Sequence, residues 1–264
     1  MLIAIDHGNY AVKTPHTEFV SGLSEHRVRP PLGDEILEYE GSFWTLSGKR
    51  LPYMRDKTRD ERWFRLTLFA IAREMEAAGK LGSREEIDLA VGLPPEHYGL
   101  LRERFAKYFK RGNVSFVYKD KPVNLTIRHV LVYPQAYAAV IPQSGVITMN
   151  NEIIGKVSAE HDMRVEDEHI SAVLLGRGTI LPEDVKRTIR TAAEAHARGI
   201  LDQLRELQVD LRTNPAIFIG GGSILFRTLL EHSSMVAQAS FVTDPKANAI
   251  GYELLASSRL RGMP

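Results

Sequence analysis

The chain of 264 residues contains no cysteine, which excludes a disulfide framework and a thiolate metal site. It has no apolar run as long as a membrane span and no basic leader before an apolar segment, so we expect neither a membrane protein nor a secreted one. Its 34 basic residues balance 33 acidic ones, which argues against a global electrostatic footprint for nucleic acid. These absences favour a cytoplasmic protein that contacts neither membranes nor DNA directly.

The pattern of apolar residues predicts an α/β protein in which strands and helices alternate. With 44% hydrophobic residues the chain can bury a large core, and its length favours two lobes. The helix expected over residues 59–78 carries one apolar stripe. We expect strands at 2–5, 87–93, 114–118, 125–133, 216–219 and 240–242, a hairpin at 36–47, and helices at 59–78, 96–110, 147–160, 166–175, 182–207 and 244–260.

A turn near the N-terminus has residues suited to a phosphate and a metal ion. The apolar run Leu2–Ile5 ends on Asp6, whose carboxylate can hold the water shell of a magnesium ion. Gly8 allows a sharp turn that points amide N–H groups at one spot. Lys13 follows where a second strand can return and supply positive charge. The alternative is a plain hairpin turn, because Asp, Gly and Asn are common in turns for their own reasons.

A glycine triplet near the C-terminus is the second candidate loop. The expected strand 216–219 leads into Gly220, Gly221 and Gly222, which carry no β-carbon and allow a purine and ribose to lie against the backbone. Ser223 can cap a helix that begins near Ile224. The alternative is a tight strand-to-helix turn without a ligand. The spacing does not fit the dinucleotide fingerprint GxGxxG.

Pro134 is expected to open a short helix, because proline is favoured in the first turn. Gln135 is polar among the alanines that follow, and on its own it reads as a residue that faces solvent.

Several of these segments together resemble the ParM/StbA-type actin-like plasmid-segregation ATPases of Gram-positive bacteria. The similarity runs in the same order over nearly the whole chain, which makes it more specific than either glycine loop. The segments are Ile3–Lys13, Leu46–Arg50, Arg55–Thr58, Val91–Pro95, Tyr133–Tyr137, Gly145–Asn151, Phe218–Ser223 and Asp244–Tyr252.

The resemblance implies a two-lobed actin-like, ribonuclease H-like fold with an ATP site. Residues 1–143 with 245–264 would form the first lobe and 144–244 a reduced second lobe. Asp6 would lie near Mg²⁺, and Gln135 would orient the attacking water, by analogy with the superfamily. The residues expected to bind the nucleotide are Asp6, Gly8, Asn9, Tyr10, Lys13, Gly220, Gly221, Gly222 and Ser223.

One part of the family pattern is missing from the sequence. Family members follow the Pro-Gln-Ala-Tyr segment with a strand, a second aspartate-glycine phosphate loop and a return strand, whereas here Val140–Ser144 continues directly into Gly145. The loss removes the partner aspartate of Asp6 and the hydroxyl and amide donors to the γ-phosphate, so we expect weak or absent hydrolysis.

The resemblance implies ATP-dependent filaments and a DNA-bound adaptor protein as partners. The alternatives are a small-molecule kinase or phosphatase of the same superfamily, and a catalytically impaired nucleotide-binding remnant. The residues do not decide between ATP and GTP.

Overall fold

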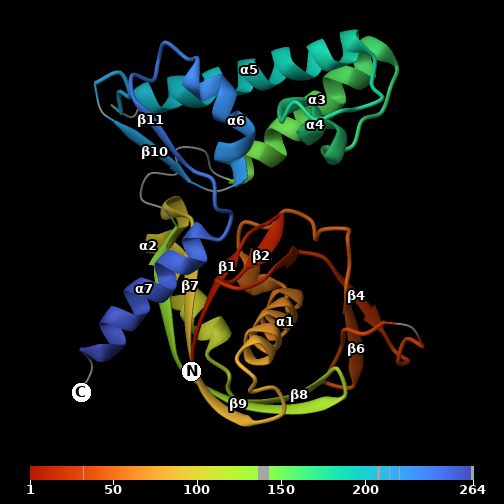
Figure 1. Ribbon diagram of the computed structural model, residues 1–264, viewed down its shortest axis with the longest axis vertical. Helices are drawn as coiled ribbons and strands as arrows, with labels where there is room; N and C mark the ends of the chain where they lie inside the picture. The colour runs from red at the N-terminus through yellow and green to blue at the C-terminus, as the bar shows by residue number, and fades with distance from the viewer. Residues whose placement is uncertain (32, 136–142, 207–208, 214, 220, 263–264) are drawn as a thin grey trace. The chain divides into compact units, whose positions relative to one another are not determined.

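The computed structural model describes residues 1–31, 33–135, 143–206, 209–213, 215–219 and 221–262. The chain divides into two compact units, of which the first comprises Met1–Tyr137 with Lys246–Pro264 and the second Ala138–Pro245. The mixed α/β class expected from the sequence is confirmed (Figure 1). Among the described helices, none combines the length and the apolar character that a membrane crossing requires.

The first unit is built on a nine-stranded sheet with the strand order β3-β2-β1-β7-β9-β8-β5-β6-β4. Its centre is parallel, because β1 pairs with β7 and β7 with β9 in the same direction, and the outer pairs are antiparallel. The strands are β1 (Leu2–His7), β2 (Ala11–Lys13), β3 (Glu18–Val20), β4 (Leu23–His26), β5 (Ile36–Tyr39), β6 (Ser42–Leu46), β7 (Arg84–Leu93), β8 (Gly112–Tyr118) and β9 (Lys121–Pro134).

The two ends of this strand order meet at Ser21 and Gly22. These two residues alone separate β3 from β4, which are the first and last strands of the sheet, so the sheet must curl back on itself. The Ser47 N–H donates to the Gly22 carbonyl at 3.0 Å, and the Leu51 N–H donates to the Ser21 carbonyl at 2.7 Å. The contact leaves no room at Gly22, where a β-carbon would lie 2.3 Å from the carbonyl oxygens of Ser47 and Lys49.

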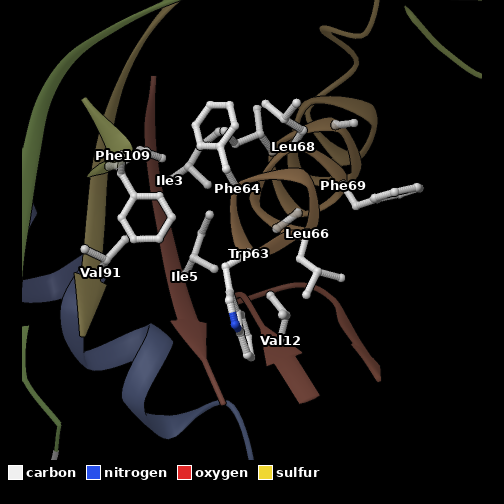
Figure 2. Close-up of a cluster of buried hydrophobic side chains, with 14 of the residues drawn as sticks. Ile3, Ile5, Val12, Trp63, Phe64, Leu66, Leu68, Phe69, Val91 and Phe109 are labelled. Carbon is white, nitrogen blue, oxygen red and sulfur yellow. The ribbon is translucent and has the colours of Figure 1, made fainter. Parts of the chain in front are cut away.

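Helix α1 (Arg62–Ala77) lies inside the curl of the sheet, and strands surround it (Figure 1). Its buried residues occupy most sides of the helix, and they include Trp63, Phe64, Leu66, Leu68 and Phe69 (Figure 2). The buried surface of α1 is therefore wider than the single apolar stripe predicted. Glu76 stays exposed, but most of the helix is covered by strands, and the curl of the sheet depends on pairings between distant strands that local periodicity does not report.

The sheet is covered on its other face by α7 (Ala247–Arg261). Tyr252 and Ala256 of this helix pack against Ala4, Ala90 and Leu131 from the three parallel strands. Helix α2 (Pro95–Phe109) instead contributes Phe105 and Phe109 to the larger core around α1. The parallel strands are thus buried on both faces, as parallel sheets generally are.

The second unit is mainly helical in the residues that the structure describes. Its core joins four helices to a two-stranded parallel sheet, in which Ala216 lies opposite Ala239. These elements are α3 (Gln143–His161), α4 (Asp167–Leu174), α5 (Glu183–Glu206), β10 (Ala216–Ile219), α6 (Gly221–Glu231) and β11 (Ala239–Val242).

Two local predictions in this part of the chain need correction. Helix α6 begins at Gly221 and not near Ile224, so Ser223 lies in its first turn. Phe226 and Leu230 are buried in the core and fix the helix, and glycine costs about 1 kcal/mol relative to alanine, too little to prevent the additional turn. Pro134 ends β9 rather than opening a helix, because a strand end tolerates the missing N–H. The short helix expected after it falls on residues 136–142, outside the described residues.

We predict that Gly22→Ala destabilises the protein by about 2 kcal/mol or more, because the new β-carbon would collide with two backbone carbonyls that cannot move independently. Urea unfolding followed by circular dichroism measures the change. Gly48→Ala is the matched control, since a β-carbon there meets nothing within 4 Å. Equal stability of the two variants would contradict the proposed closure of the sheet at Gly22.

Candidate functional site

The carboxyl ends of the three parallel strands bring together residues that are far apart in the sequence. Strand β1 ends at Asp6 and His7, β7 at Leu93, and β9 is followed by Gln135. The Gln135 backbone N–H donates to the Leu93 carbonyl at 2.7 Å, which fixes the position of Gln135 at this edge. In open α/β sheets, ligands bind outside the carboxyl ends of the strands. This edge is therefore the candidate ligand-binding site of the first unit.

The Asp6 carboxylate is buried and accepts hydrogen bonds from two side-chain amides. Gln135 Nε2 donates to one oxygen at 2.8 Å, and Asn248 Nδ2 of α7 donates to the other at 3.3 Å. Alternation along β1 explains this environment, because Ala4 and Asp6 face α7 whereas Ile3, Ile5 and His7 face α1. Neutral donors stabilise the charge of the carboxylate without cancelling it.

Tyr252 of α7 lies near Asp6, and its ring restricts the size of the residue on the facing strand. Its ring stacks on Tyr133 with the centroids 6.1 Å apart. A β-carbon on Gly92 of β7 would lie 2.0 Å from its hydroxyl oxygen, so only glycine fits opposite this ring. Burial, assisted by the Asp6 charge, raises the pKa of Tyr252 well above its usual value. The Tyr252 phenol is therefore uncharged at neutral pH and lines one side of the site.

Two lysines place positive charge near Asp6. Lys13 of β2 lies directly opposite Asp6 in the antiparallel register and is buried. Lys57 precedes α1 in a short 3-10 helix (Lys57–Arg59), and its ammonium donates to the His7 carbonyl. Burial lowers the pKa of Lys57 to about 8, the attraction of Asp6 opposes this shift, and the repulsion of Lys13 adds to it. The Lys57 ammonium is therefore mostly protonated at neutral pH.

His7 contributes no charge to the cluster. Its Nε2 lies 2.9 Å from the Thr67 hydroxyl of α1, and its ring stacks on Phe109 with the centroids 4.7 Å apart. Burial and the nearby Lys57 charge lower the pKa of His7 to about 3. One carboxylate and two ammonium groups therefore give the cluster a net charge of about +1, which suits a bound anion.

The remaining N-terminal site residues form the turn between β1 and β2. Gly8 is buried, and its carbonyl accepts a hydrogen bond from the Ser21 hydroxyl at 2.6 Å. Tyr10 is mostly exposed, and its carbonyl accepts a hydrogen bond from the Ser21 N–H at 2.9 Å. Asn9 is partly exposed. Ser21, at the junction of the sheet edges, thus holds the turn at Gly8 and Tyr10 in place through two hydrogen bonds.

The C-terminal site residues belong to the second unit. Gly221, Gly222 and Ser223 form the first turn of α6 directly after β10, and Ser223 is buried. The first turn of a helix has N–H groups without partners inside the helix, which is a favourable environment for a polar ligand. Gly220 lies outside the described residues.

The sequence interpretation did not assign Lys57, Asn248 or Tyr252 to the site. Each reaches Asp6 or its turn from a distant segment, and no local spacing signals that proximity. The one available signal was their position inside segments that resemble the ATPase family, Arg55–Thr58 and Asp244–Tyr252.

Among the described residues, no group of three or more His, Asp or Glu side chains is arranged to hold a metal ion. A metal at Asp6 would therefore take most of its ligands from water or from a bound anion.

Comparisons with known proteins support an actin-like fold. The sequence profile of the N-terminal domain of actin-like proteins matches residues 37–137. A search of curated proteins found no significant match. Among solved structures, an archaeal actin homologue is similar at 15% identity and a TM-score of 0.69, with 98% of this chain and 99% of that chain covered.

Two ParM structures are also similar. The apo ParM protein of pSK41 has 13% identity and a TM-score of 0.66 over 98% of both chains. A ParM from a 15-stranded filament of Clostridium botulinum has 15% identity and a TM-score of 0.70, and 97% of this chain and 99% of that chain are covered. The chain is an actin-like protein in fold, and the resemblance inferred from its motifs is confirmed at this level.

We predict that His7 makes stability depend on pH below 6.5. In the unfolded chain His7 binds a proton near pH 6.5, whereas in the folded chain it does so only near pH 3. The free energy of unfolding therefore falls as the pH drops through this window. Between pH 7 and pH 5 the loss should be about 2 kcal/mol larger in the wild type than in His7→Gln. Urea unfolding at both pH values measures it.

His26→Gln is the control, because it removes a 3.0 Å contact between a histidine Nε2 and the Thr45 hydroxyl at a more exposed place. An identical pH dependence in the wild type and His7→Gln would contradict the burial of neutral His7.

Proposed function

We propose that this actin-like chain binds an adenine nucleotide through the Asp6 cluster, together with Mg²⁺, and assembles with copies of itself into filaments. The observation that carries the proposal is a buried carboxylate with two lysines at the carboxyl ends of three parallel strands. The turn at Gly8 and the two ammonium groups match the chemistry of phosphates. Nothing in this cluster selects an apolar ligand.

The similar structures favour a nucleotide as the anion. The archaeal actin homologue has also been solved in a complex with ADP, and it is 13% identical to this chain with a TM-score of 0.67. A filament of AlfA, 15% identical with a TM-score of 0.60, is bound to AMPPNP. Both ligands carry adenine, which is why we propose an adenine nucleotide and not a guanine one.

The residues present fit a magnesium ion that is bound mainly through water. Mg²⁺ typically uses one or two carboxylates and completes its shell with water and substrate phosphates. Asp6 supplies a buried carboxylate, and its two amide donors hold it in one orientation. The ion would neutralise phosphate charge beside Lys13 and Lys57. We propose that Gln135, which donates a hydrogen bond to Asp6, orients a water molecule.

The glycine turn of the second unit is proposed to bind the adenosine. Gly221 and Gly222 follow a buried strand and precede a packed helix, so their backbone is fixed without side chains of its own. A flat base can approach such a backbone closely.

We predict that Gly221→Val lowers the affinity for ATP at least about ten-fold, because a branched side chain would occupy the position of the adenosine. Isothermal titration calorimetry with MgATP measures the change. Gly178→Val is the matched control in the same unit, since its position is exposed and a β-carbon there meets nothing within 4 Å. Unchanged ATP affinity in Gly221→Val would remove this loop from the site.

Self-association is supported by the assemblies in which similar chains occur. Structures of filaments are known for the Clostridium botulinum ParM, for Alp12 and for AlfA. The near balance of 34 basic and 33 acidic residues imposes little long-range repulsion between copies. A contact between unlike surfaces that does not close generates an open strand. We propose plasmid segregation as the biological role, with a DNA-bound adaptor protein as the partner.

We predict that the protein sediments as filaments when MgATP is added and stays in the supernatant without nucleotide. Ultracentrifugation and electron microscopy measure this, and Gly221→Val should remain soluble under both conditions. A wild-type chain that binds ATP but stays monomeric at high concentration would contradict filament formation. That result would favour a small-molecule kinase or phosphatase of the same superfamily.

A further inference from the structure

Lys57 is held at the edge of the candidate site by contacts on both sides of its backbone. Asp56 caps the short helix through the Thr58 N–H at 3.1 Å and pairs with Arg104 of α2 at 2.8 Å. On the other side, the Tyr108 hydroxyl donates to the Asp60 carbonyl at 2.8 Å. The Lys57 ammonium therefore points at the turn after β1 from a fixed support.

Among the described residues, the Lys57 ammonium has fewer hydrogen-bond acceptors than it has donors. Its Nζ donates to the His7 carbonyl and lies 4.4 Å from the centroid of the Trp63 ring. Within the described part of the chain, that carbonyl is its one hydrogen-bond acceptor, although an ammonium group has three donors.

Lysines elsewhere in the first unit have better charge partners. The Lys119 ammonium lies 2.8 Å from a carboxylate oxygen of Glu76, and the Lys80 ammonium lies 3.1 Å from one of Glu85. Burial lowers the pKa of Lys57 to about 8. Removing a cation from water is costly unless a counter-charge compensates. The remaining N–H donors of Lys57 are therefore available to bind an anion.

We propose that Lys57 is a phosphate-binding residue whose ammonium contacts the phosphates of the nucleotide beside Lys13 and Asp6. The inference rests on the proposed nucleotide site and adds to it a residue from outside the two glycine loops. It also assigns part of the phosphate charge to a side chain in a sequence that lacks the second phosphate loop.

The competing explanation is that Lys57 only holds the His7 carbonyl and so shapes the turn. The two roles differ in how they depend on the ligand. A phosphate contact matters more for ATP than for AMP, because ATP carries more negative charge and reaches further into the cluster. A purely structural role would weaken the binding of both nucleotides by the same factor.

The test compares the affinities for MgATP and AMP in Lys57→Gln, which keeps a donor for the His7 carbonyl but removes the charge. Calorimetry should show an ATP affinity reduced about ten-fold or more and an AMP affinity within about two-fold of the wild type. Lys57→Met keeps an unbranched side chain of similar length and serves as a second neutral variant if the first does not fold. Lys57→Arg should retain most of the ATP affinity.

Lys119→Gln is the matched control, because its ammonium also lies near an aromatic ring, 5.4 Å from the Tyr118 centroid, but pairs with Glu76. It should bind both nucleotides like the wild type. Equal losses for ATP and AMP in the neutral Lys57 variants, or no loss, would overturn the inference. A wild-type chain that binds neither nucleotide would overturn the proposed function itself, and with it this inference.

Discussion

Strand β1 is buried on both of its faces, and this constraint organises the first unit. Because side chains alternate along a strand, Ile3, Ile5 and His7 must enter the core around α1, while Ala4 and Asp6 must face α7. The strand needs small residues toward α7 and large ones toward α1, and it delivers a carboxylate and an imidazole to opposite sides of the same end. Figure 2 shows Ile3 and Ile5 packed toward α1 beside Phe64 and Trp63.

The same alternation explains why Asp6 and His7 differ chemically. Asp6 meets the amides of Gln135 and Asn248, which stabilise a charged carboxylate. His7 meets the Thr67 hydroxyl and the Phe109 ring, an environment that keeps the imidazole neutral. The polar edge therefore holds one negative and two positive groups in a fixed arrangement. The proposed binding of phosphates uses this charge balance.

The sequence predicted the order of the elements well, because buried strands such as β7 and amphipathic helices such as α5 have clear local periodicity. It underestimated the burial of α1, since the curl of the sheet depends on Gly22 and on pairings between distant strands. It also missed β3 and β4, which are only three and four residues long. Asp6, Gly8 and Lys13 could be named from one short turn. Lys57 and Asn248 could not be named from local spacing, because folding brings them to Asp6 from distant segments.

The most direct test of the central claim is hydrogen exchange of the backbone amides with and without MgATP, followed by mass spectrometry. The account predicts slower exchange in two separate segments, residues 6–13 and the first turn of α6 at 221–224, with little change in α5. Together these would place the nucleotide at the two glycine-containing loops of the chain. Protection confined to other segments, or no change at saturating MgATP, would contradict the assignment of the site.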